Sequence, residues 1–381
     1  MKRMKNRLLS LFAMALVTAL VITLTPGETP AGQPASTQES EWQGLIEAAR
    51  KEGVLTVYAT AVPPQARAAV QQAFKQKFGI QVEYTPLSAG AIVAKYKSEI
   101  ASGLHIPDIF HTGASQFVNL IKPMDVTIPL EPLLVLPEVK DPGKWYRGTL
   151  PFFDADKHGL MAGLLAGHYY LVNTELVKQN EITATTDLLN PKWKGQIAMQ
   201  NPTRAGASQS WIANILLHIL GMEKGEVFLR GLAKQEPIIS SQSRQLAEWV
   251  ARGKYKVGVG ISQAQGVYFM DQGAPLAFGE AYGRFKEPRT LTTGATMIYS
   301  FKNVPHPNAR KLFINWFFSK EGSTIYAPLQ GYPSTRTDVP TESFNAALLP
   351  RPGDILAGEE SELKKSEFSK LSAKIFKHLL K

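Results

Sequence analysis

Polar side chains directly follow an apolar segment in the stretch YKVGVGISQAQGVYF. An alternation of apolar residues and glycines ends at Ile261, and Ser262, Gln263 and Gln265 come next. The alternation predicts a short buried strand. Hydroxyl and amide groups at its end can serve as a nucleophile, as hydrogen-bond partners of a ligand, or as parts of an ordinary turn.

The nucleophile interpretation rests on a near match to one motif. Gly260–Ala264 differs from the G-x-S-x-G nucleophile elbow by the alanine at its last position. A serine hydrolase also needs an acid and a histidine, and Asp271 and His306 follow Ser262 in that order without a recognisable setting. A secreted serine hydrolase is therefore an alternative, and ligand binding by these polar side chains is favoured.

A second candidate site lies in NPTRAGAS, residues 201–208, directly before a predicted helix. Thr203, Gly206 and Ser208 are small enough for a ligand to approach the backbone N–H groups, and Arg204 adds a positive charge. A helix N-terminus attracts anions, so this segment is typical of a site for an anion or a carboxylate. A simple helix cap at Ser208 or Thr203 is the alternative.

Other small polar residues also follow predicted strands. In HTGASQF they precede a predicted helix, and a lone histidine such as His111 is more often structural than functional at such a place. Parallel α/β sheets bind ligands at the carboxyl ends of their strands, which is why these residues are predicted to contact a ligand. The further ligand-binding candidates are Thr60, Ala61, Thr112, Gly113, Ser115 and Ser241.

The composition and the motifs disfavour metal, cofactor and nucleic-acid sites. The chain has no cysteine and no phosphate loop, and DADKHG (154–159) starts like a calcium loop whose twelfth position is Leu165 rather than glutamate. The net charge is +10, but the basic residues are scattered without interleaved aromatic residues. We expect no cofactor, no bound nucleic acid and a modest preference for anionic ligands.

The N-terminus is typical of an exported protein. Lys2, Arg3, Lys5 and Arg7 precede the apolar run LLSLFAMALVTALVITL, as in a secretory signal peptide. Residues 1–31 are predicted to be signal peptide and leader, and a retained membrane anchor is the alternative. Without cysteine, neither a lipid attachment nor a disulfide can form, so we expect a secreted protein without a lipid tether.

Helices and strands alternate along the chain. Strands are predicted at VLTVYA, IQVEYTP and PDIFHTG, each followed by a predicted helix. This order predicts a doubly wound, parallel α/β sheet. A second α/β region follows a proline-rich stretch at 122–158. The tail GEESELKKSEFSKLSAKIFKHLLK predicts a helix that packs against the body, or, as the alternative, lies on a membrane surface.

Several phrases occur in the order found in one known family. Across residues 41–340 they are GVLTVYAT, FKQKFGIQVEY, IPDIFHTGASQF, LLNPKWKGQIAMQNPTRAGAS, LAEWVARGKYKVGVGIS, NVPHPNARKLFINWFFSKEG and GYPSTRTDV. The chain resembles the extracellular solute-binding proteins of ABC importers, in the cluster that contains the ferric-ion-binding proteins. The resemblance implies an α/β fold of the periplasmic binding protein type II class, with two doubly wound lobes joined by a two-segment hinge.

The resemblance also implies a division of the chain. Lobe 1 would comprise residues 41–167 and 286–340, lobe 2 residues 168–285, and a helical extension residues 341–381. A hinge needs a few residues between well-formed elements, and two glycine-containing segments suit it. The predicted hinge residues are Gly167, His168, Tyr170, Glu280 and Tyr282.

In the ferric members of the cluster, two adjacent tyrosines after the strand equivalent to 257–261 bind the metal. Gln265 and Gly266 hold those positions here, Tyr268 is the nearest phenol, and Tyr169–Tyr170 falls in the predicted hinge strand. Ferric iron prefers several anionic oxygen donors, and these loops carry mostly neutral ones. No metal ligand is therefore predicted, and binding of ferric iron or an iron chelate through Tyr268 is the alternative.

The resemblance and the polar strand ends together predict a solute-binding component of an ABC transporter that is not an enzyme. We expect a monomer in the periplasm that captures a small anionic or zwitterionic solute by hinge closure. The solute would then be delivered to a permease in the inner membrane.

Overall fold

The computed structural model describes residues 37–204, 206–294 and 296–380 of the 381 residues. The chain divides into two units, residues 1–40 and 41–381, and the second unit holds the sheets. The predicted signal peptide and leader, residues 1–31, lie outside the described residues.

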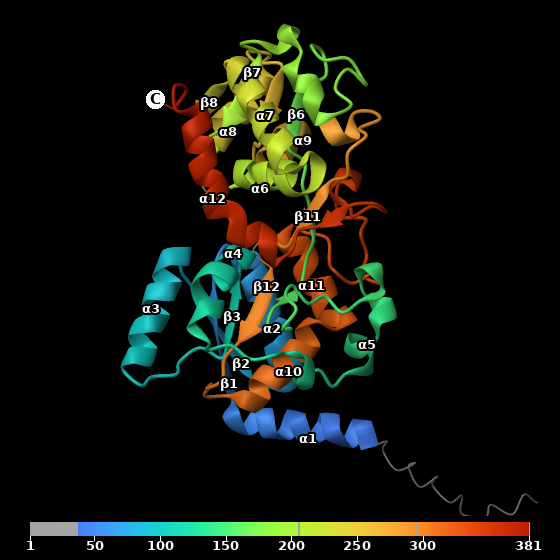
Figure 1. Ribbon diagram of the computed structural model, residues 1–381. Helices are drawn as coiled ribbons and strands as arrows, with labels where there is room; N and C mark the ends of the chain where they lie inside the picture. Colours follow the sequence, from blue (N-terminus) through green and yellow to red (C-terminus); the bar gives the residue numbers. More distant parts are fainter. Residues whose placement is uncertain (1–36, 205, 295, 381) are drawn as a thin grey trace, which may run out of the picture. The chain divides into compact units, whose positions relative to one another are not determined.

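One five-stranded sheet takes strands from distant parts of the sequence (Figure 1). Its three N-terminal strands are parallel, as the alternation of helices and strands predicts. β12 runs antiparallel to both of its neighbours, because the chain re-enters this sheet after building the second one. In spatial order the strands are β2 (Gln81–Pro86), β1 (Val54–Ala59), β3 (Ile109–Thr112), β12 (Met297–Ser300) and β4 (Leu160–Met161).

A second five-stranded sheet is formed by the middle of the chain. β7 is parallel to β8 and β9, and β6 is antiparallel to β9 and β10. We call the two sheets with their helices the first and the second lobe. In spatial order the strands are β10 (Leu276–Phe278), β6 (Tyr170–Asn173), β9 (Val257–Val259), β7 (Ile197–Gln200) and β8 (Ile238–Ser240).

Each lobe has its own hydrophobic core. In the first lobe, the ring of Phe74 lies 5.3 Å from that of Phe313 and 5.2 Å from that of Trp316. In the second lobe, the buried Trp211 donates a hydrogen bond of 2.8 Å from Nε1 to Tyr170 Oη. The expected α/β fold with two lobes is therefore confirmed. The helices up to the second lobe are α1 (Thr37–Glu52), α2 (Pro64–Phe78), α3 (Ala89–Ala101), α4 (Ala114–Gln116) and α5 (Pro137–Lys140).

A third, small sheet lies where the chain passes between the lobes. β5 (Leu165–Ala166) pairs antiparallel with β11 (Thr290–Thr292), and β11 pairs parallel with β13 (Ile355–Leu356). The first crossing therefore lies next to the predicted Gly167. The remaining helices are α6 (Ala207–Asn214), α7 (Gly221–Lys234), α8 (Ser243–Ala251), α9 (Gln263–Asp271), α10 (Pro307–Phe317), α11 (Lys320–Gln330) and α12 (Glu359–Phe376).

Glu280 and Tyr282, the predicted residues of the second hinge segment, contact the second lobe. Glu280 accepts a hydrogen bond of 2.6 Å from the backbone N–H of Tyr169, and the Tyr282 ring packs against the core of the second lobe. Further along the chain, Glu287 accepts a hydrogen bond of 2.8 Å from the backbone N–H of Thr185 in the second lobe. Glu280 and Tyr282 are thus held by the second lobe, and the return passes through β11. A hinge role for Glu280 and Tyr282 stays a prediction.

The C-terminal tail folds back as the predicted helix, α12. Phe368 and Phe376 are buried in the core of the second lobe, which agrees with packing against the body rather than exposure of an apolar face. In the described ranges, no helix is both long enough and apolar enough to cross a membrane.

The end of β9 approaches the start of α6 very closely. Gly260 has a φ of +61°, and a Cβ atom there would lie 2.6 Å from the Cβ and 2.7 Å from the Cα of Ser208. Ser208 cannot move aside easily, because it is fully buried and its Oγ donates a hydrogen bond to the carbonyl of Asn201. Glycine is therefore required here both by the backbone conformation and by the close contact.

We predict that Gly260→Ala lowers the free energy of unfolding by roughly 2–4 kcal/mol, from backbone strain and overpacking. Gly273→Ala is the matched control: its φ is +81°, but nothing lies within 4 Å of the added Cβ. The control is expected to cost about 1 kcal/mol. Chemical denaturation of both variants measures the difference, and equal losses would contradict the close contact.

His111 is a structural residue of the first lobe. Its ring is fully buried on β3, and its Nε2 lies 2.8 Å from Tyr326 Oη. Burial disfavours the charged imidazolium and lowers the pKa of His111 to about 3.

We predict that the burial of His111 makes the protein less stable in acid. The unfolded chain takes up this proton near pH 6.5, whereas the folded protein does so only near pH 3. The unfolded state therefore binds more protons between these values, and stability falls as the pH falls below 6.5. Between pH 7.5 and 5.0 the wild type should lose about 2 kcal/mol more than His111→Gln in urea denaturation. Equal losses of unfolding free energy in the wild type and in His111→Gln would contradict this prediction, because they would show that His111 takes up the proton in the folded protein as well.

Candidate functional site

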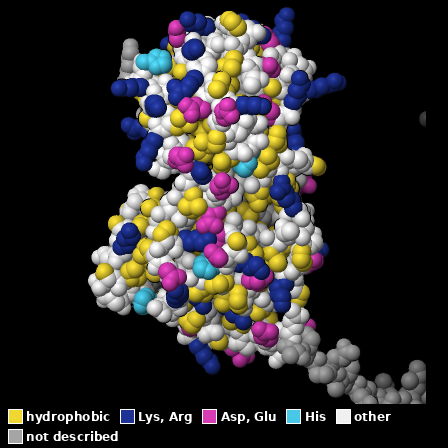
Figure 2. All heavy atoms as spheres, in the orientation of Figure 1, with side chains coloured by type: hydrophobic (Ala, Val, Ile, Leu, Met, Phe, Trp, Pro, Cys, Tyr) yellow, Lys and Arg dark blue, Asp and Glu magenta, His cyan; other side chains and the backbone are white. Residues whose placement is uncertain are grey.

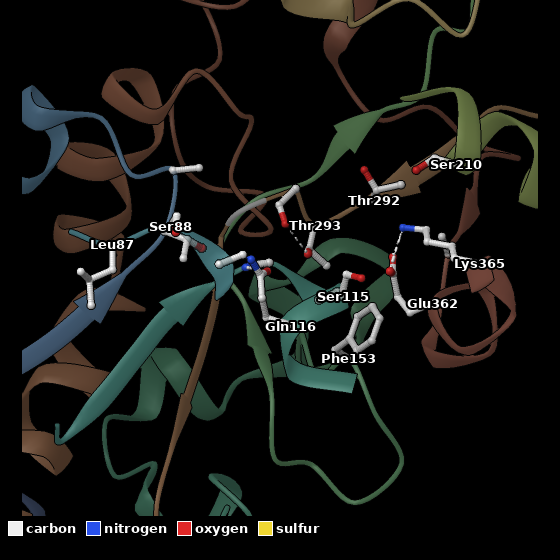
Figure 3. Close-up of a pocket in the computed structure, with 17 residues that line it drawn as sticks. Leu87, Ser88, Ser115, Gln116, Phe153, Ser210, Thr292, Thr293, Glu362 and Lys365 are labelled. Carbon is white, nitrogen blue, oxygen red and sulfur yellow. Dashed lines mark hydrogen bonds and ion pairs between the residues drawn. The ribbon is translucent and has the colours of Figure 1, made fainter. Parts of the chain in front are cut away.

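A cleft lined by both lobes consists of two adjoining cavities. The larger has a volume of about 870 Å³ and the smaller, drawn in Figure 3, of about 430 Å³. Both are bordered by Ala61, Ser210, Thr292 and Gly294, which come from both lobes and from the strand between them. The two cavities thus form one continuous hollow, large enough for a metabolite-sized solute.

The first-lobe wall is built at the carboxyl ends of three parallel strands, as the sequence predicts. Thr60 and Ala61 follow β1, Leu87–Ala89 follow β2, and Gly113 and Ser115 follow β3. The backbone N–H of Thr60 donates a hydrogen bond of 3.0 Å to the carbonyl of His111, which ties the first and third of these loops together. This wall presents mainly backbone groups and small hydroxyls.

The second-lobe wall carries the polar residues that follow β9. Ser262 and Gln263 line the larger cavity, together with Gly206 at the start of α6. Gly206 has a φ of +151°, a conformation that favours glycine. Gln263 is nine-tenths buried, and its Nε2 has no hydrogen-bond partner within the protein. These three predicted residues are therefore brought to the same cleft.

Six predicted ligand-binding residues line neither cavity in the described part of the chain. The Oγ1 of Thr112 lies 2.9 Å from Tyr299 Oη, and the hydroxyls of Thr203 and Ser208 donate to Asn201. Neither of the latter two caps α6, whose N-cap is Gly206 without a side-chain hydrogen bond. Thr203 and Ser208 thus bond to a residue nearby in the sequence, whereas Thr112 bonds to the side chain of Tyr299, which is distant in the sequence. The six residues are Thr112, Thr203, Arg204, Ser208, Ser241 and Gln265.

The cleft also contains residues that the sequence did not suggest. Glu362 and Lys365 from α12 line the smaller cavity, next to Thr292 and Thr293 (Figure 3). Lys365 Nζ lies 2.6 and 2.7 Å from the two carboxylate oxygens of Glu362. Their spacing along a charged helix resembles that of an ordinary surface pair, so no signal in the sequence marks them.

His168 lies at the junction between the lobes and lines the larger cavity. Its ring stacks on Phe278 at 4.6 Å, and its Nε2 lies 3.1 Å from Arg289 Nη1. Arg289 also forms a buried ion pair of 2.6 Å with Asp354 of the tail. Gly167 donates a hydrogen bond of 2.6 Å from its N–H to Thr290 in β11. A hinge role for Gly167 and His168 stays a prediction.

The two neighbouring tyrosines at the start of β6, Tyr169 directly before it and Tyr170 as its first residue, are poorly suited to bind a metal as phenolates. Burial raises the pKa of Tyr169 and of Tyr170, which disfavours the anionic form. Tyr170 also lies in the core, where its Oη is bonded to Thr185 and Trp211. In the described ranges, no three His, Cys, Asp or Glu side chains are grouped so that they could hold a metal ion.

Tyr268 is different, because it is exposed and lines the larger cavity. A hydrogen bond with Gln272 and the positive charge of Arg244 lower the pKa of Tyr268. The Arg244 guanidinium lies 4.6 Å from the centre of the ring. Among the tyrosines that line the cleft, it is the one whose phenolate the surroundings favour.

The histidine that a hydrolase would need is not brought to Ser262, although Asp271 lines the same cavity. His306 Nδ1 lies 2.9 Å from Asp108 Oδ2 in the first lobe, and Asp108 also bonds the backbone of Thr56. The relay Asp271–His306–Ser262 is therefore not formed.

On the face shown in Figure 2, Lys and Arg side chains are scattered among acidic ones rather than gathered in one stripe.

Solved structures of other proteins share this fold. An iron- and citrate-bound IdiA (FutA) of Trichodesmium matches with a TM-score of 0.67 and 17% identity, over 85% of this chain and 99% of that one. Iron-bound HitA of Pseudomonas aeruginosa matches with a TM-score of 0.62 and 18% identity, over 84% of this chain and 99% of that one. AfuA of Actinobacillus pleuropneumoniae with bound fructose 6-phosphate matches with a TM-score of 0.55 and 20% identity, over 86% of this chain and 97% of that one. At such identities the likeness shows the fold alone.

A comparison with the curated proteins found no match. The family described as bacterial extracellular solute-binding protein matches residues 69–349, which is most of the chain. The two lobes, the cleft between their strand ends and this match agree with the resemblance stated from the sequence. The chain belongs to the bacterial extracellular solute-binding protein family.

Proposed function

We propose that this protein captures a small, polar, anionic or zwitterionic solute in the periplasm and delivers it to an ABC permease. The family membership supports solute binding, and the ligands of two similar structures, citrate with iron and fructose 6-phosphate, are both anionic. The protein acts as a monomer after removal of the leader, and it changes no bond of the solute.

One observation carries this proposal. Three glutamine side chains in the walls of the larger cavity have a buried polar atom without a hydrogen-bond partner in the protein: Gln200 Oε1, Gln263 Nε2 and Gln330 Oε1. Gln330 ends α11 in the first lobe, and the other two belong to the second. These atoms expose almost no surface in this arrangement, so a polar solute bonds to them only after the amides turn toward it. Because buried polar groups without partners are costly, such bonds to both walls stabilise the loaded protein.

Closure follows from the same geometry. The chain crosses between the lobes through short strands, and α12 contacts both lobes. The two walls can approach each other with little change inside either lobe when the contacts of α12 with one lobe shift. A solute that bonds to both walls has a higher affinity for the closed state, whereas a solute that bonds to one wall has no such preference. A permease that recognises the closed state then distinguishes the loaded protein from the empty one.

We predict that the purified protein binds at least one small anion and closes when it does. Calorimetry measures the affinity, and small-angle scattering measures the decrease in the radius of gyration. Ser262→Ala and Gln263→Leu should each weaken binding by roughly 2- to 12-fold, the value of one hydrogen bond. Ser241→Ala is the matched control, because Ser241 is exposed and lines neither cavity.

Unchanged affinity in both cleft variants would show that the solute binds elsewhere. Binding without compaction would contradict delivery by closure. Turnover of a solute that is lost in Ser262→Ala would place the protein among enzymes instead.

A second candidate function is the binding of ferric iron or an iron chelate. The observation that favours it is Tyr268, an exposed phenol in the cleft whose pKa is lowered by Gln272 and Arg244. A phenolate is a hard anionic oxygen donor of the kind that ferric iron prefers.

Iron coordination by Tyr268 predicts a visible charge-transfer band when ferric citrate is added. The band should disappear in Tyr268→Phe and remain in Tyr332→Phe, a control phenol in the same cavity whose pKa is raised by burial. Absorbance spectroscopy measures both variants. A colourless wild type would exclude Tyr268 as a ligand of the metal.

A further inference from the structure

The tail of the chain places an ion pair in the cleft. Lys365 and Glu362 lie one turn apart on α12 and line the smaller cavity (Figure 3). Their side chains retain only 21% and 9% of their exposure, so the pair is largely withdrawn from water. This pair belongs to neither sheet, and it reaches the cleft only because the tail folds back.

Lys365 is the one lysine or arginine that lines either cavity within the described ranges. Arg204, the cation suggested by the sequence, is exposed and lines neither. An anionic solute in this hollow therefore meets one cationic side chain, that of Lys365.

The hydrogen bonds of Lys365 leave one donor free. An ammonium group has three N–H donors, and the two carboxylate oxygens of Glu362 accept two of them. Elsewhere in the described chain, Lys365 has no other hydrogen bond or ion pair. The third donor can bond an oxygen of a solute without breaking the pair, so the Glu362 carboxylate keeps its compensating charge.

Hydroxyl groups from both lobes surround the same cavity. Ser115 follows β3 in the first lobe, Ser210 lies on α6 in the second, and Thr292 lies on β11 between them (Figure 3). A carboxylate or phosphate group has several acceptor oxygens, so it can bond to Lys365 and to these hydroxyls together.

The helix that carries Lys365 is attached to both lobes. Lys122 of the first lobe lies 2.8 Å from Glu359 at the start of α12, and Ser369 Oγ donates a hydrogen bond of 2.9 Å to the carbonyl of Thr203 in the second. These contacts fix the position of Lys365 at the junction of the lobes.

We infer that the Lys365–Glu362 pair of α12 is the anion-recognition element of the cleft and selects solutes that carry a carboxylate or phosphate group. This rests on the proposed function and goes further, because it assigns the charged contact to the C-terminal helix rather than to a strand end. Lys365 attracts the anionic group, and Glu362 orients the ammonium while its own charge limits the affinity.

The test uses calorimetry at constant ionic strength on the full chain without its leader. The probes are fructose 6-phosphate, inorganic phosphate and citrate, with fructose as the uncharged comparison. Lys365→Gln should weaken binding of the tightest anion roughly 10-fold or more, the loss of a charge-assisted hydrogen bond. Lys365→Arg keeps the charge and should stay within about 3-fold of the wild type.

Two further variants separate charge from folding. Lys364→Gln is the matched control, because Lys364 lies on the same helix, pairs with Glu367 at 3.6 Å and lines neither cavity. It should bind like the wild type. Glu362→Gln removes the competing negative charge and should strengthen anion binding several-fold, a gain that a misfolded protein does not show.

The outcomes distinguish the inference from the proposed function. If the wild type binds an anion and Lys365→Gln binds it equally well, the inference is overturned and solute binding stands. If the wild type binds fructose as tightly as fructose 6-phosphate, anion selection is overturned. If the wild type binds none of the four probes, the proposed solute class fails, and the inference fails with it.

Discussion

The buried ion pair between Arg289 and Asp354 is the contact on which the junction of the lobes depends. Arg289 precedes β11, the strand that returns the chain to the first lobe, and Asp354 precedes β13, which extends the same small sheet. Both side chains are almost completely buried, and Arg289 also donates to the carbonyls of Ala347 and Leu349. Breaking such a pair leaves an uncompensated buried charge. The tail is thereby fixed to the crossing strand, and α12 is directed into the cleft.

The cleft follows from how parallel strands end. In each lobe, small polar residues such as Thr60, Ser115 and Ser262 follow the carboxyl ends of the strands and line the cleft. Gly260 and Gly206 allow the backbone to turn sharply enough to place Gln263 in the wall. Each lobe keeps a separate apolar core, so the polar surfaces between them remain open to a solute.

Electrostatics decide which groups of the cleft can contact an anion or a metal. Burial keeps Tyr169 protonated, whereas Gln272 and Arg244 favour ionisation of Tyr268. The single cation of the lining, Lys365, is partly neutralised by Glu362. The lining therefore combines hydroxyls, amides and one lysine with the carboxylates of Glu362 and Asp271.

Local pattern was sufficient for the order of strands and helices and for the polar residues at strand ends, because periodicity and capping act over a few residues. Thr60, Ala61, Gly113, Ser115, Gly206, Ser262 and Gln263 reach the cleft as predicted, since a strand's end determines where its next residues lie. Thr112 and Ser208 do not line the cleft. The hydroxyl of Thr112 bonds to Tyr299, which is distant in the sequence, and the hydroxyl of Ser208 donates to the carbonyl of Asn201. Lys365 could be placed only by tertiary packing: a residue far along the chain enters the site through the burial of Phe368 and the ion pair at Asp354, and no local pattern contains those contacts.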